Sequence, residues 1–351
     1  MTSIAKPRVQ HPSMEKNALG LTRRDYEGSM STLCAGCGHD SITAALIQAC
    51  WELDLQPHTV AKMSGIGCSS KTPTYFMSEA HGFNAVHGRM PAVATGASAA
   101  NKDLVCIGIS GDGDSLSIGL GQLCHAIRRN VNMLYVLENN GVYGLTKGQF
   151  SASADVGSKS KKGEPNPQQP IDPVLLALSL GASFVARGFS GDKAQLVPLL
   201  KAGLKHRGFG LIDVISPCVT FNDHEGSTKS YLYTRRHMHE AAPVDLVPTY
   251  QEITASPSPG GVTAVTMHDG SVVRFRKLEE GHDPTDRDAA YALVRKFQEE
   301  DVVVTGLFYI AESAPDMHGI NKTVDAPLVN VPYEELCPGA KALDDLLDEF
   351  R

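Results

Sequence analysis

Two hydrophobic patterns alternate along the chain from about residue 40 onward. Apolar residues first recur at the 3.6-residue period of a helix, which Asp40 is placed to cap. These periodic positions are Ile42, Ala45, Leu46, Ala49, Cys50 and Leu53. Four apolar runs follow that are too short for helices and have the character of buried parallel strands. They cover residues 59–63, 104–109, 133–137 and 211–215.

Helical patterns lie between these runs, at residues 91–100, 116–129, 173–180 and 193–206. A repeated strand–helix–strand order builds a parallel sheet with helices on both faces. We therefore predict an α/β fold with a doubly wound parallel sheet in a core of residues 30–240. Residues 1–29 are predicted to be an N-terminal extension, and residues 151–170, which have almost no large apolar side chains, a long loop.

The pattern changes after the core, and residues 241–351 are predicted to form a C-terminal α+β extension. It contains a hairpin turning at His268-Asp269-Gly270, a helix at residues 286–298 and a strand at residues 302–308. A short acidic helix completes this wrapping extension.

The charge balance excludes some functions. The 351 residues carry a net charge of -7, with an isoelectric point near 6.0 and no sustained basic stretch. Nucleic-acid binding depends on neutralising phosphates with Lys and Arg, so no nucleic-acid partner is expected. The first 20 residues lack the apolar region of a signal peptide, and 18 apolar residues never run together. We therefore expect no membrane span and a cytoplasmic location.

A turn rich in glycine and aspartate, Gly111-Asp112-Gly113-Asp114, directly follows one predicted strand and opens a helix. Backbone N–H groups at such a turn form an anion site, yet neither a dinucleotide fingerprint nor a P-loop is present. Instead Asn139-Asn140 follows 25 residues later, at the end of the next strand. Parallel strands end at one sheet edge, so Asp112, Asn140 and a backbone carbonyl beyond it are predicted to hold Mg²⁺ there. Taken singly, the two pieces are also consistent with a helix cap and a simple turn.

This spacing resembles the diphosphate motif of thiamine-diphosphate enzymes. The next segment, Tyr143-Gly144-Leu145-Thr146-Lys147-Gly148-Gln149, is similar to the β subunits of 2-oxoacid:ferredoxin oxidoreductases, especially the 2-oxoglutarate-using and broad-range members. The resemblance runs from an early CxxC to the tail segment Asp283-Pro284-Thr285-Asp286-Arg287. It implies a thiamine-diphosphate-binding core, with Val142 joining Asp112 and Asn140 on Mg²⁺. The other cofactor-binding residues that it implies are Gly67, Ser69, His87, Gly111, Gly113, Asp114, Gly144, Leu145 and Thr146.

The eight cysteines add a second candidate site. Cys34 and Cys37 form a CxxC that fits neither a c-type haem site nor a thioredoxin-like dithiol, which leaves a metal. Cys68 and Cys218 each follow a predicted strand, so both belong at the same sheet edge as the Asp112 turn. Four converging thiolates suit a [4Fe–4S] cluster or an all-cysteine zinc site, and spacing does not separate the two.

The family resemblance favours the cluster, because the family's four ligand positions correspond to Cys34, Cys37, Cys68 and Cys218. The remaining cysteines, Cys50, Cys106, Cys124 and Cys337, are interpreted as core or incidental thiols. No ferredoxin-type run of cysteines is present, so electrons are expected to leave to a separate carrier.

The resemblance implies a thiamine-dependent enzyme that decarboxylates 2-oxoglutarate oxidatively to succinyl-CoA and CO₂ and passes electrons through the cluster to ferredoxin, in either direction. Its partners would be an α subunit in an α2β2 assembly, ferredoxin, CoA and the 2-oxo acid. Lys71 and Lys147 are candidates for contacting the substrate or diphosphate anions. A pyruvate or broad-range member of the family, or a zinc-stapled thiamine-diphosphate subunit without redox function, remains as an alternative.

Overall fold

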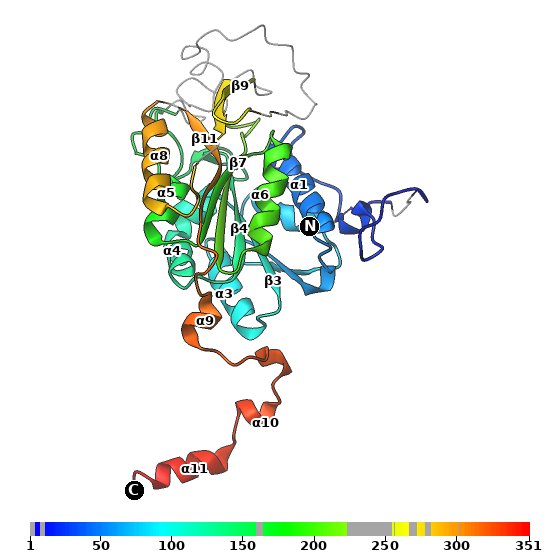
Figure 1. The fold of residues 1–351 in the computed structure, drawn as a ribbon, viewed down its shortest axis with the longest axis vertical. Helices are drawn as coiled ribbons and strands as arrows, with labels where there is room; N and C mark the ends of the chain where they lie inside the picture. Colours follow the sequence, from blue (N-terminus) through cyan, green and yellow to red (C-terminus); the bar gives the residue numbers. More distant parts are fainter. Residues whose placement is uncertain are drawn as a thin grey trace.

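The computed structural model describes residues 4–7, 11–158, 164–222, 255, 257–266, 272–277, 282–300 and 302–351. In these residues the central feature is a nine-stranded sheet with the order β2-β1-β3-β4-β8-β7-β11-β10-β9 (Figure 1). Its first six strands in chain order are β1 (Val60–Ser64), β2 (His81–Asn84), β3 (Val105–Gly111), β4 (Met133–Asn139), β7 (Phe184–Phe189) and β8 (Phe209–Ile215). These six run parallel to one another, which confirms the predicted parallel sheet.

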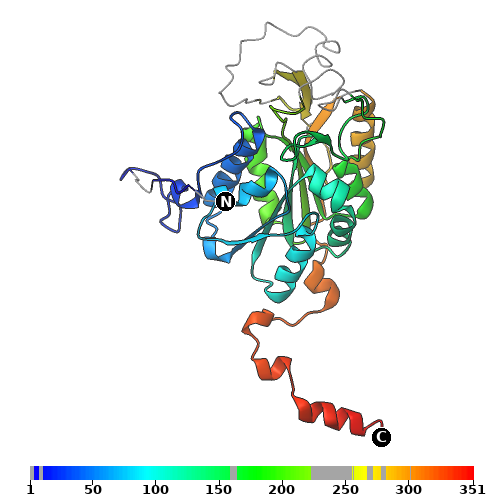
Figure 2. The same cartoon turned by 180° about the vertical axis from the view of Figure 1, so that it is seen from behind.

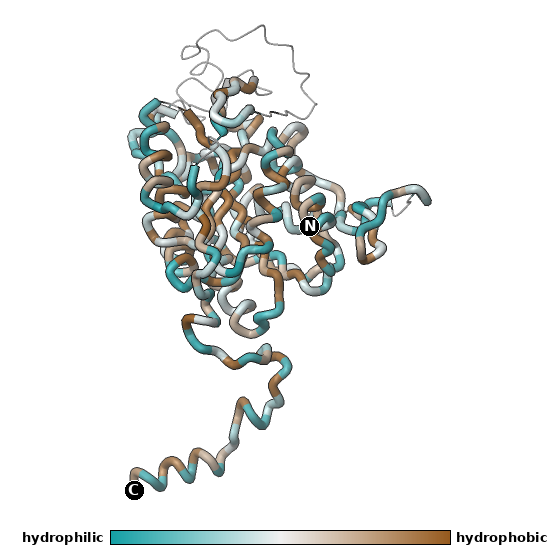
Figure 3. The backbone as a smooth tube through the Cα atoms, in the orientation of Figure 1, coloured by the Kyte–Doolittle hydropathy of each residue, from teal (hydrophilic) through white to brown (hydrophobic). Residues whose placement is uncertain are grey.

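Helices cover both faces of this sheet (Figures 1 and 2). One face packs against α1 (Gly38–Glu52) and α6 (Lys193–Lys205) through a core that includes Leu46 and Leu200. The other face packs against four helices, α3 (Met90–Ala100), α4 (Leu120–Arg128), α5 (Pro173–Leu180) and α8 (Arg287–Glu299). Because β4 and β8 are covered on both sides, every residue of both strands is buried. The apolar colour concentrated along the central strands in Figure 3 follows from this arrangement.

Two predicted helix starts are wrong. The first helix begins at Gly38 with Cys37 at its N-cap position, so Asp40 lies in the first turn and does not cap it. The helix predicted over residues 116–129 is α4, which begins at Leu120 and is preceded by a π-helical turn at Gly113–Ile118. Helical backbone therefore starts immediately after Asp112, at the end of β3. That placement matters for the site described below.

The strands of the C-terminal extension join the same sheet. β9 (Val262–Thr266) and β10 (Val272–Lys277) pair antiparallel, β10 pairs parallel with β11 (Val303–Ile310), and β11 pairs antiparallel with β7. The predicted turn at His268-Asp269-Gly270 lies outside the described residues. Beyond α9 (Met317–Asn321) the chain leaves the body as an arm that carries α10 (Tyr333–Leu336) and α11 (Ala340–Asp348) (Figure 1).

Smaller elements surround the main sheet. β5 (Val142–Tyr143) and β6 (Gln149–Phe150) form a two-stranded hairpin directly after β4, and α2 (Thr72–Tyr75) follows β1. Short 3-10 helices occur at Arg23–Tyr26, Pro57–Thr59, Ser69–Lys71 and Leu328–Asn330. In the described parts of the chain, no helix has the length and apolar character needed to cross a membrane.

Candidate active site at the carboxyl edge of the sheet

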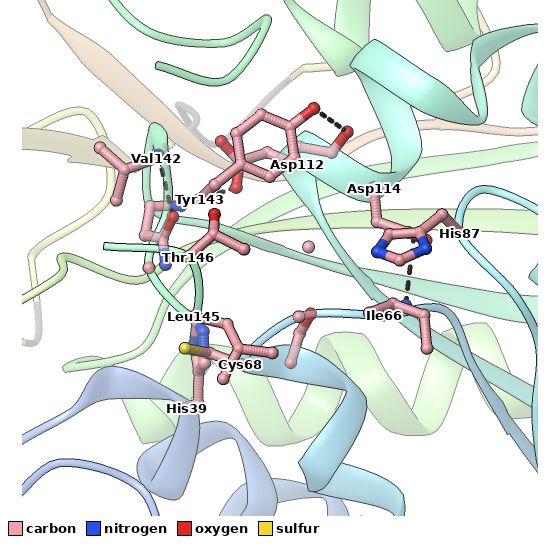
Figure 4. A pocket seen from close by; sticks show the side chains of 16 residues that line it. His39, Ile66, Cys68, His87, Asp112, Asp114, Val142, Tyr143, Leu145 and Thr146 are labelled. Carbon is pink, nitrogen blue, oxygen red and sulfur yellow. Dashed lines mark hydrogen bonds between the residues drawn. The ribbon is translucent and has the colours of Figure 1, made fainter. Parts of the chain in front are cut away.

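The segments that follow β1, β2, β3 and β4 line an open pocket together with His39 at the start of α1. Sixteen residues line it, and Figure 4 shows ten of them labelled. All twelve residues that the sequence assigned to cofactor binding are among them: Gly67, Ser69, His87, Gly111, Asp112, Gly113, Asp114, Asn140, Val142, Gly144, Leu145 and Thr146. The fold thus brings into one cavity residues that lie far apart in the sequence.

Asp112 lies at the end of β3 with its carboxylate almost fully buried. Its Oδ2 accepts hydrogen bonds from the hydroxyls of Ser151 at 2.5 Å and Ser153 at 2.6 Å. Its Oδ1 has a longer contact, 3.5 Å from the Asn140 backbone nitrogen. One oxygen is therefore fixed by two hydroxyls, while the other lies beside Asn140. A buried carboxylate oxygen next to an amide side chain is a suitable ligand pair for Mg²⁺.

Asn140 is also ordered by its neighbours. Its Oδ1 accepts a hydrogen bond from the Val142 backbone nitrogen at 3.0 Å, and its backbone carbonyl accepts one from the Asn222 side chain at 3.0 Å. These contacts hold the turn between β4 and β5 against the Asp112 turn. The three predicted Mg²⁺ ligands, Asp112, Asn140 and Val142, are consequently all buried and belong to one cavity.

Asp114 lines the same pocket, but its carboxylate is engaged by the protein. Oδ1 accepts from the backbone nitrogens of Gly88 at 2.8 Å and Ile66 at 3.2 Å, and Oδ2 accepts from the Ser110 hydroxyl at 2.7 Å. Figure 4 shows the contact with Ile66. The side chain therefore ties the loop after β1 and the segment before α3 to the end of β3. We assign it to shaping the pocket wall.

Gly113 has a steric role in this turn. The Tyr143 hydroxyl donates to the Gly113 carbonyl at 3.0 Å, and the tyrosine ring packs directly over this glycine. A Cβ at Gly113 would come within 2.5 Å of that ring. The glycine thus lets the loop after β4 close over the first turn of the helix.

The four predicted cysteine ligands gather beside this pocket. Cys68 lines it directly, and a Cβ placed on Gly144 would lie 3.3 Å from the sulfur of Cys68 and 3.8 Å from that of Cys218. Both thiols therefore face the space that the missing side chain of Gly144 leaves open. The Thr220 hydroxyl contacts the sulfur of Cys34 at 3.6 Å, which places the CxxC next to the Cys218 segment.

The thiols also act on one another electrostatically. Burial raises the pKa of Cys37, Cys68 and Cys218, and neighbouring thiols raise it further: Cys218 acts on Cys37 and Cys68, and Cys34 acts on Cys68 and Cys218. A cationic metal centre would offset this cost, because it favours the thiolate form. In the described part of the chain, no three or more His, Cys, Asp or Glu side chains have the arrangement of a site for one metal ion.

Neither predicted substrate lysine is among the lining residues. Lys71 is partly exposed, its Nζ lies 3.5 Å from the Thr32 carbonyl, and its charge lowers the pKa of Cys68 against the effect of burial. Lys147 is exposed, with a positive φ of 78°, directly after the lining residue Thr146. Lys71 thus lies on the cysteine side of the pocket, and Lys147 lies at its edge.

Several site residues had no assigned role in the sequence. His39, Ile66 and Tyr143 line the pocket, and Ser151 and Ser153 hold Asp112. His39 and Tyr143 lie next to recognised motifs, and that proximity was their only signal. The two serines lie in the long polar loop predicted over residues 151–170, and nothing in the local pattern of that loop indicates a contact with Asp112.

The fold and site define the class of protein. A parallel sheet with its ligand pocket at the carboxyl edge, an Asp turn after one strand and an Asn turn after the next are the features of a thiamine-diphosphate-binding domain. Residues 64–214 match the family model "Thiamine pyrophosphate enzyme, C-terminal TPP binding domain". Residues 273–325 match the family model for the C-terminal part of the pyruvate ferredoxin oxidoreductase beta subunit.

Curated relatives narrow the class. The chain is 47% identical over 191 residues to a 2-oxoacid:ferredoxin oxidoreductase β subunit of Sulfolobus, covering 54% of this chain and 63% of the relative. It is 41% identical over 220 residues to the 2-oxoglutarate oxidoreductase subunit KorB of Mycobacterium tuberculosis, covering 60% of this chain and 58% of the relative. It is 35% identical over 208 residues to the 2-oxoglutarate synthase subunit KorB of Methanothermobacter thermautotrophicus, covering 59% and 72%.

A solved structure matches over more of the chain. This structure is of 2-oxoglutarate:ferredoxin oxidoreductase from Magnetococcus marinus with 2-oxoglutarate, coenzyme A and succinyl-CoA bound, and it aligns with a TM-score of 0.70 at 31% identity. The alignment covers 89% of this chain and 90% of that one. The chain belongs to the family of 2-oxoacid:ferredoxin oxidoreductase β subunits, although it matches less than two thirds of the length of the Sulfolobus and mycobacterial relatives.

Proposed function

We propose that this chain is the β subunit of a CoA-acylating 2-oxoglutarate:ferredoxin oxidoreductase. It would bind thiamine diphosphate through Mg²⁺ and would pass electrons through a [4Fe–4S] cluster to ferredoxin. The observation that carries the proposal is the composition of one cavity. Its wall combines the Asp112 and Asn140 turns with Cys68, and Cys68 and Cys218 both face the space at Gly144.

Magnesium binding is supported by the state of the Asp112 carboxylate. Ser151 and Ser153 fix Oδ2, so Oδ1 is oriented toward Asn140, and the two turns offer three oxygen ligands with the Val142 carbonyl. Mg²⁺ in such sites takes few ligands from protein and completes its shell with phosphate and water oxygens. The backbone N–H groups at the start of the helical turn after Asp112 are suited to the diphosphate.

The cluster is supported by the donor set. Cys34, Cys37, Cys68 and Cys218 come from three segments, and thiolates are the ligands of iron–sulfur clusters. When bound, thiamine diphosphate supplies the electron sink for decarboxylation, and the cluster supplies one-electron acceptance. The two groups would be adjacent, because Gly144 lines the pocket and the Cys68 and Cys218 thiols face the space where its side chain is missing. A zinc site on the same thiols is the competing proposal, and metal analysis distinguishes it.

The substrate is proposed to be 2-oxoglutarate. Two of the relatives reported above are named as 2-oxoglutarate enzymes, and the Magnetococcus structure is of a 2-oxoglutarate enzyme with 2-oxoglutarate and coenzyme A bound. A second carboxylate on the substrate requires a cation, and Lys147 lies at the pocket edge directly after Thr146. We therefore propose that Lys147 contacts the distal carboxylate and that Lys71 provides positive charge near the cluster.

An α subunit is proposed to complete the active site, in an α2β2 assembly. The Sulfolobus relative is named as a β subunit, which implies a partner chain. None of the sixteen described lining residues is a glutamate, whereas thiamine enzymes use a glutamate to activate the cofactor. The proposed α subunit supplies that residue.

Activity of the reconstituted complex tests this proposal. The chain is co-expressed anaerobically with its α subunit, and ferredoxin or viologen reduction is measured with 2-oxoglutarate, pyruvate or 2-oxobutyrate. Reduction that requires both CoA and the 2-oxo acid, is fastest with 2-oxoglutarate and is absent for the isolated chain supports the proposal. Steady turnover by the isolated chain, or preference for pyruvate, would contradict it.

A further inference from the structure

Beneath the pocket, a buried carboxylate interacts with groups from several segments. Glu138, near the end of β4, has no exposed surface. The Thr72 hydroxyl donates to its two carboxyl oxygens at 3.0 and 3.3 Å, and His39 Nδ1 lies 3.5 Å from Oε2. His39, which is 1% exposed, also contacts the Ser216 hydroxyl through Nδ1 at 2.8 Å.

The sequence positions of these partners connect them with the thiols. His39 lies two residues after Cys37, Thr72 lies four residues after Cys68, and Ser216 lies two residues before Cys218. Each of the three segments that carry a predicted cluster ligand therefore contributes one side chain to the same buried group of contacts. Glu138 itself lies two residues before Asn140, on the strand that leads to the proposed Mg²⁺ site.

The start of α1 also lies very close to the ends of β7 and β8. A Cβ on Gly38 would lie 2.5 Å from the Ser216 hydroxyl oxygen and 2.6 Å from that of Ser190. Only glycine therefore lets the start of α1 approach the ends of β7 and β8 this closely. The Ser216 backbone nitrogen donates to the Asn139 carbonyl at 2.8 Å, which joins β8 to β4 just before Cys218.

We propose that Glu138 and His39 form the centre of a buried hydrogen-bond network that positions the three cysteine-bearing segments and so fixes the stability and reduction potential of the cluster. This inference rests on the proposed function, because it requires the cluster on Cys34, Cys37, Cys68 and Cys218. Glu138, His39, Thr72 and Ser216 are positioning residues in this account, since each acts through a cysteine segment.

The expected effect of mutation follows from the free-energy cost of leaving a buried polar group without a hydrogen-bond partner. A buried polar group that loses its partner pays its full desolvation penalty, so removing one member forces the others to move or to admit water. Either response changes the spacing of the thiols or the exposure of the cluster. Reduction potentials of clusters depend on hydrogen bonding, nearby charge and solvent access. Loss of the network should therefore change the potential, which a general loss of stability would not do.

The chain offers matched variants for the test. His39→Gln breaks the network, whereas His318→Gln makes the same change at a histidine that is 9% exposed and contacts the Ser98 carbonyl and Thr323 hydroxyl, both at 3.0 Å and away from the cysteine segments. Thr72→Val removes the hydroxyl at nearly constant volume, and Thr72→Ser retains it. Glu138→Gln keeps the shape of the central side chain and replaces one of its two acceptor oxygens, which face Thr72 and His39, with a donor.

The experiment uses the anaerobically purified αβ complex. Iron release to a chelator is followed by absorbance, the reduction potential by an EPR-monitored redox titration, and folding by thermal unfolding of the same samples. We expect His39→Gln and Thr72→Val to release iron at least about fivefold faster than wild type and Glu138→Gln to shift the potential. Thr72→Ser and His318→Gln should stay within about twofold of wild type in iron release and keep its potential.

Each result has a defined meaning. Iron-release rates within about twofold of wild type and an unchanged potential in His39→Gln and Thr72→Val would overturn the inference and leave the proposed function standing. Equal acceleration in His318→Gln would also overturn it, because the effect would then follow from destabilisation alone. If His39→Gln fails to fold, the Thr72→Val and Thr72→Ser pair decides. A wild-type complex with neither iron nor sulfide would instead reject the proposed function itself.

Discussion

At the residue scale, the two oxygens of Asp112 have different surroundings. Oδ2 is held by Ser151 and Ser153, while Oδ1 lies beside the Asn140 turn. This division orients the carboxylate before any cation arrives, so less ordering is needed on binding. Mutations can therefore measure two contributions to cofactor binding separately. One is the carboxylate as a charged Mg²⁺ ligand, and the other is its orientation by the two serines.

Asp112→Ala is expected to weaken binding of thiamine diphosphate with Mg²⁺ by one to two orders of magnitude, or about 1.4–3 kcal/mol, because it removes a ligand and a charge. Ser153→Ala leaves the ligand in place and should cost less than about tenfold. Isothermal titration of the αβ complex measures both. An Asp112→Ala variant that binds as tightly as wild type would show that the Mg²⁺ assignment is wrong.

Lys147→Ala is expected to raise the KM for 2-oxoglutarate by roughly one to two orders of magnitude, because a charge-assisted contact contributes about 1.5–3 kcal/mol. The KM for pyruvate, which lacks the distal carboxylate, should change less. Lys102→Ala, at a partly exposed lysine that lies outside the pocket lining, serves as the control. Equal losses on both substrates in steady-state assays would exclude this role for Lys147.

At the element scale, the strands of the core that the sequence predicted are those whose residues are mostly apolar. β1, β3, β4 and β8 follow directly from such runs, because a strand covered on both faces needs apolar side chains on both. β2 was missed because it is a short edge strand with the sequence HGFN, all of it exposed. β7 was missed because Arg187 and Gly188 interrupt its apolar run, and Arg187 is buried there only because distant acids pair with it.

Local sequence pattern also predicted only part of the candidate site. The Asp112 and Asn140 turns were predictable because each immediately follows a strand, and strand ends converge by topology alone. Ser151, Ser153 and the partners of Glu138 were not predictable, because their contacts depend on how loops pack across the edge. Local pattern contains no information on such contacts. The pocket lining was therefore predicted far better than the side chains that orient it.

The stability of β7 depends on ion pairs between Arg187 and two acids that are distant in the sequence. The Arg187 guanidinium lies 2.8 Å from Asp172, the cap of α5, and 2.7 Å from the buried Asp213 of β8. Arg187→Met leaves two buried carboxylates without a cation and should lower the free energy of unfolding by about 3–5 kcal/mol. Arg207→Met removes a guanidinium that is 75% exposed and lies 3.4 Å from the buried Asp316, so it should cost less than Arg187→Met. Similar losses in denaturant titrations of both variants would refute this account of β7.

At the scale of the whole molecule, the C-terminal extension has two parts with different relations to the sheet. β9, β10 and β11 continue the sheet beyond β7, so they belong to the same folded body. The arm beyond Pro332 lies away from this body (Figure 2). Its apolar side chains, among them Leu343 and Phe350, are exposed. The arm therefore contributes little to the packing of the chain by itself.

Deleting residues 333–351 should leave the melting temperature of the isolated chain within about 2 °C of wild type, because this segment buries none of its residues. A deletion of the same length from α8 onward, residues 287–305, would remove buried Val294 and Phe297 and should prevent cooperative unfolding. Differential scanning calorimetry measures both. A large drop in melting temperature on removal of the arm would mean that it packs against the body.

One sheet edge is proposed to hold an iron–sulfur cluster next to a thiamine-diphosphate site. The most direct measurement is the iron, acid-labile sulfide and zinc content of the anaerobically purified chain, with the Cys68→Ser variant beside it. We predict about four irons and four sulfides per chain in wild type, with broad absorption near roughly 400 nm, and loss of both in the variant. Stoichiometric zinc without sulfide would contradict the account.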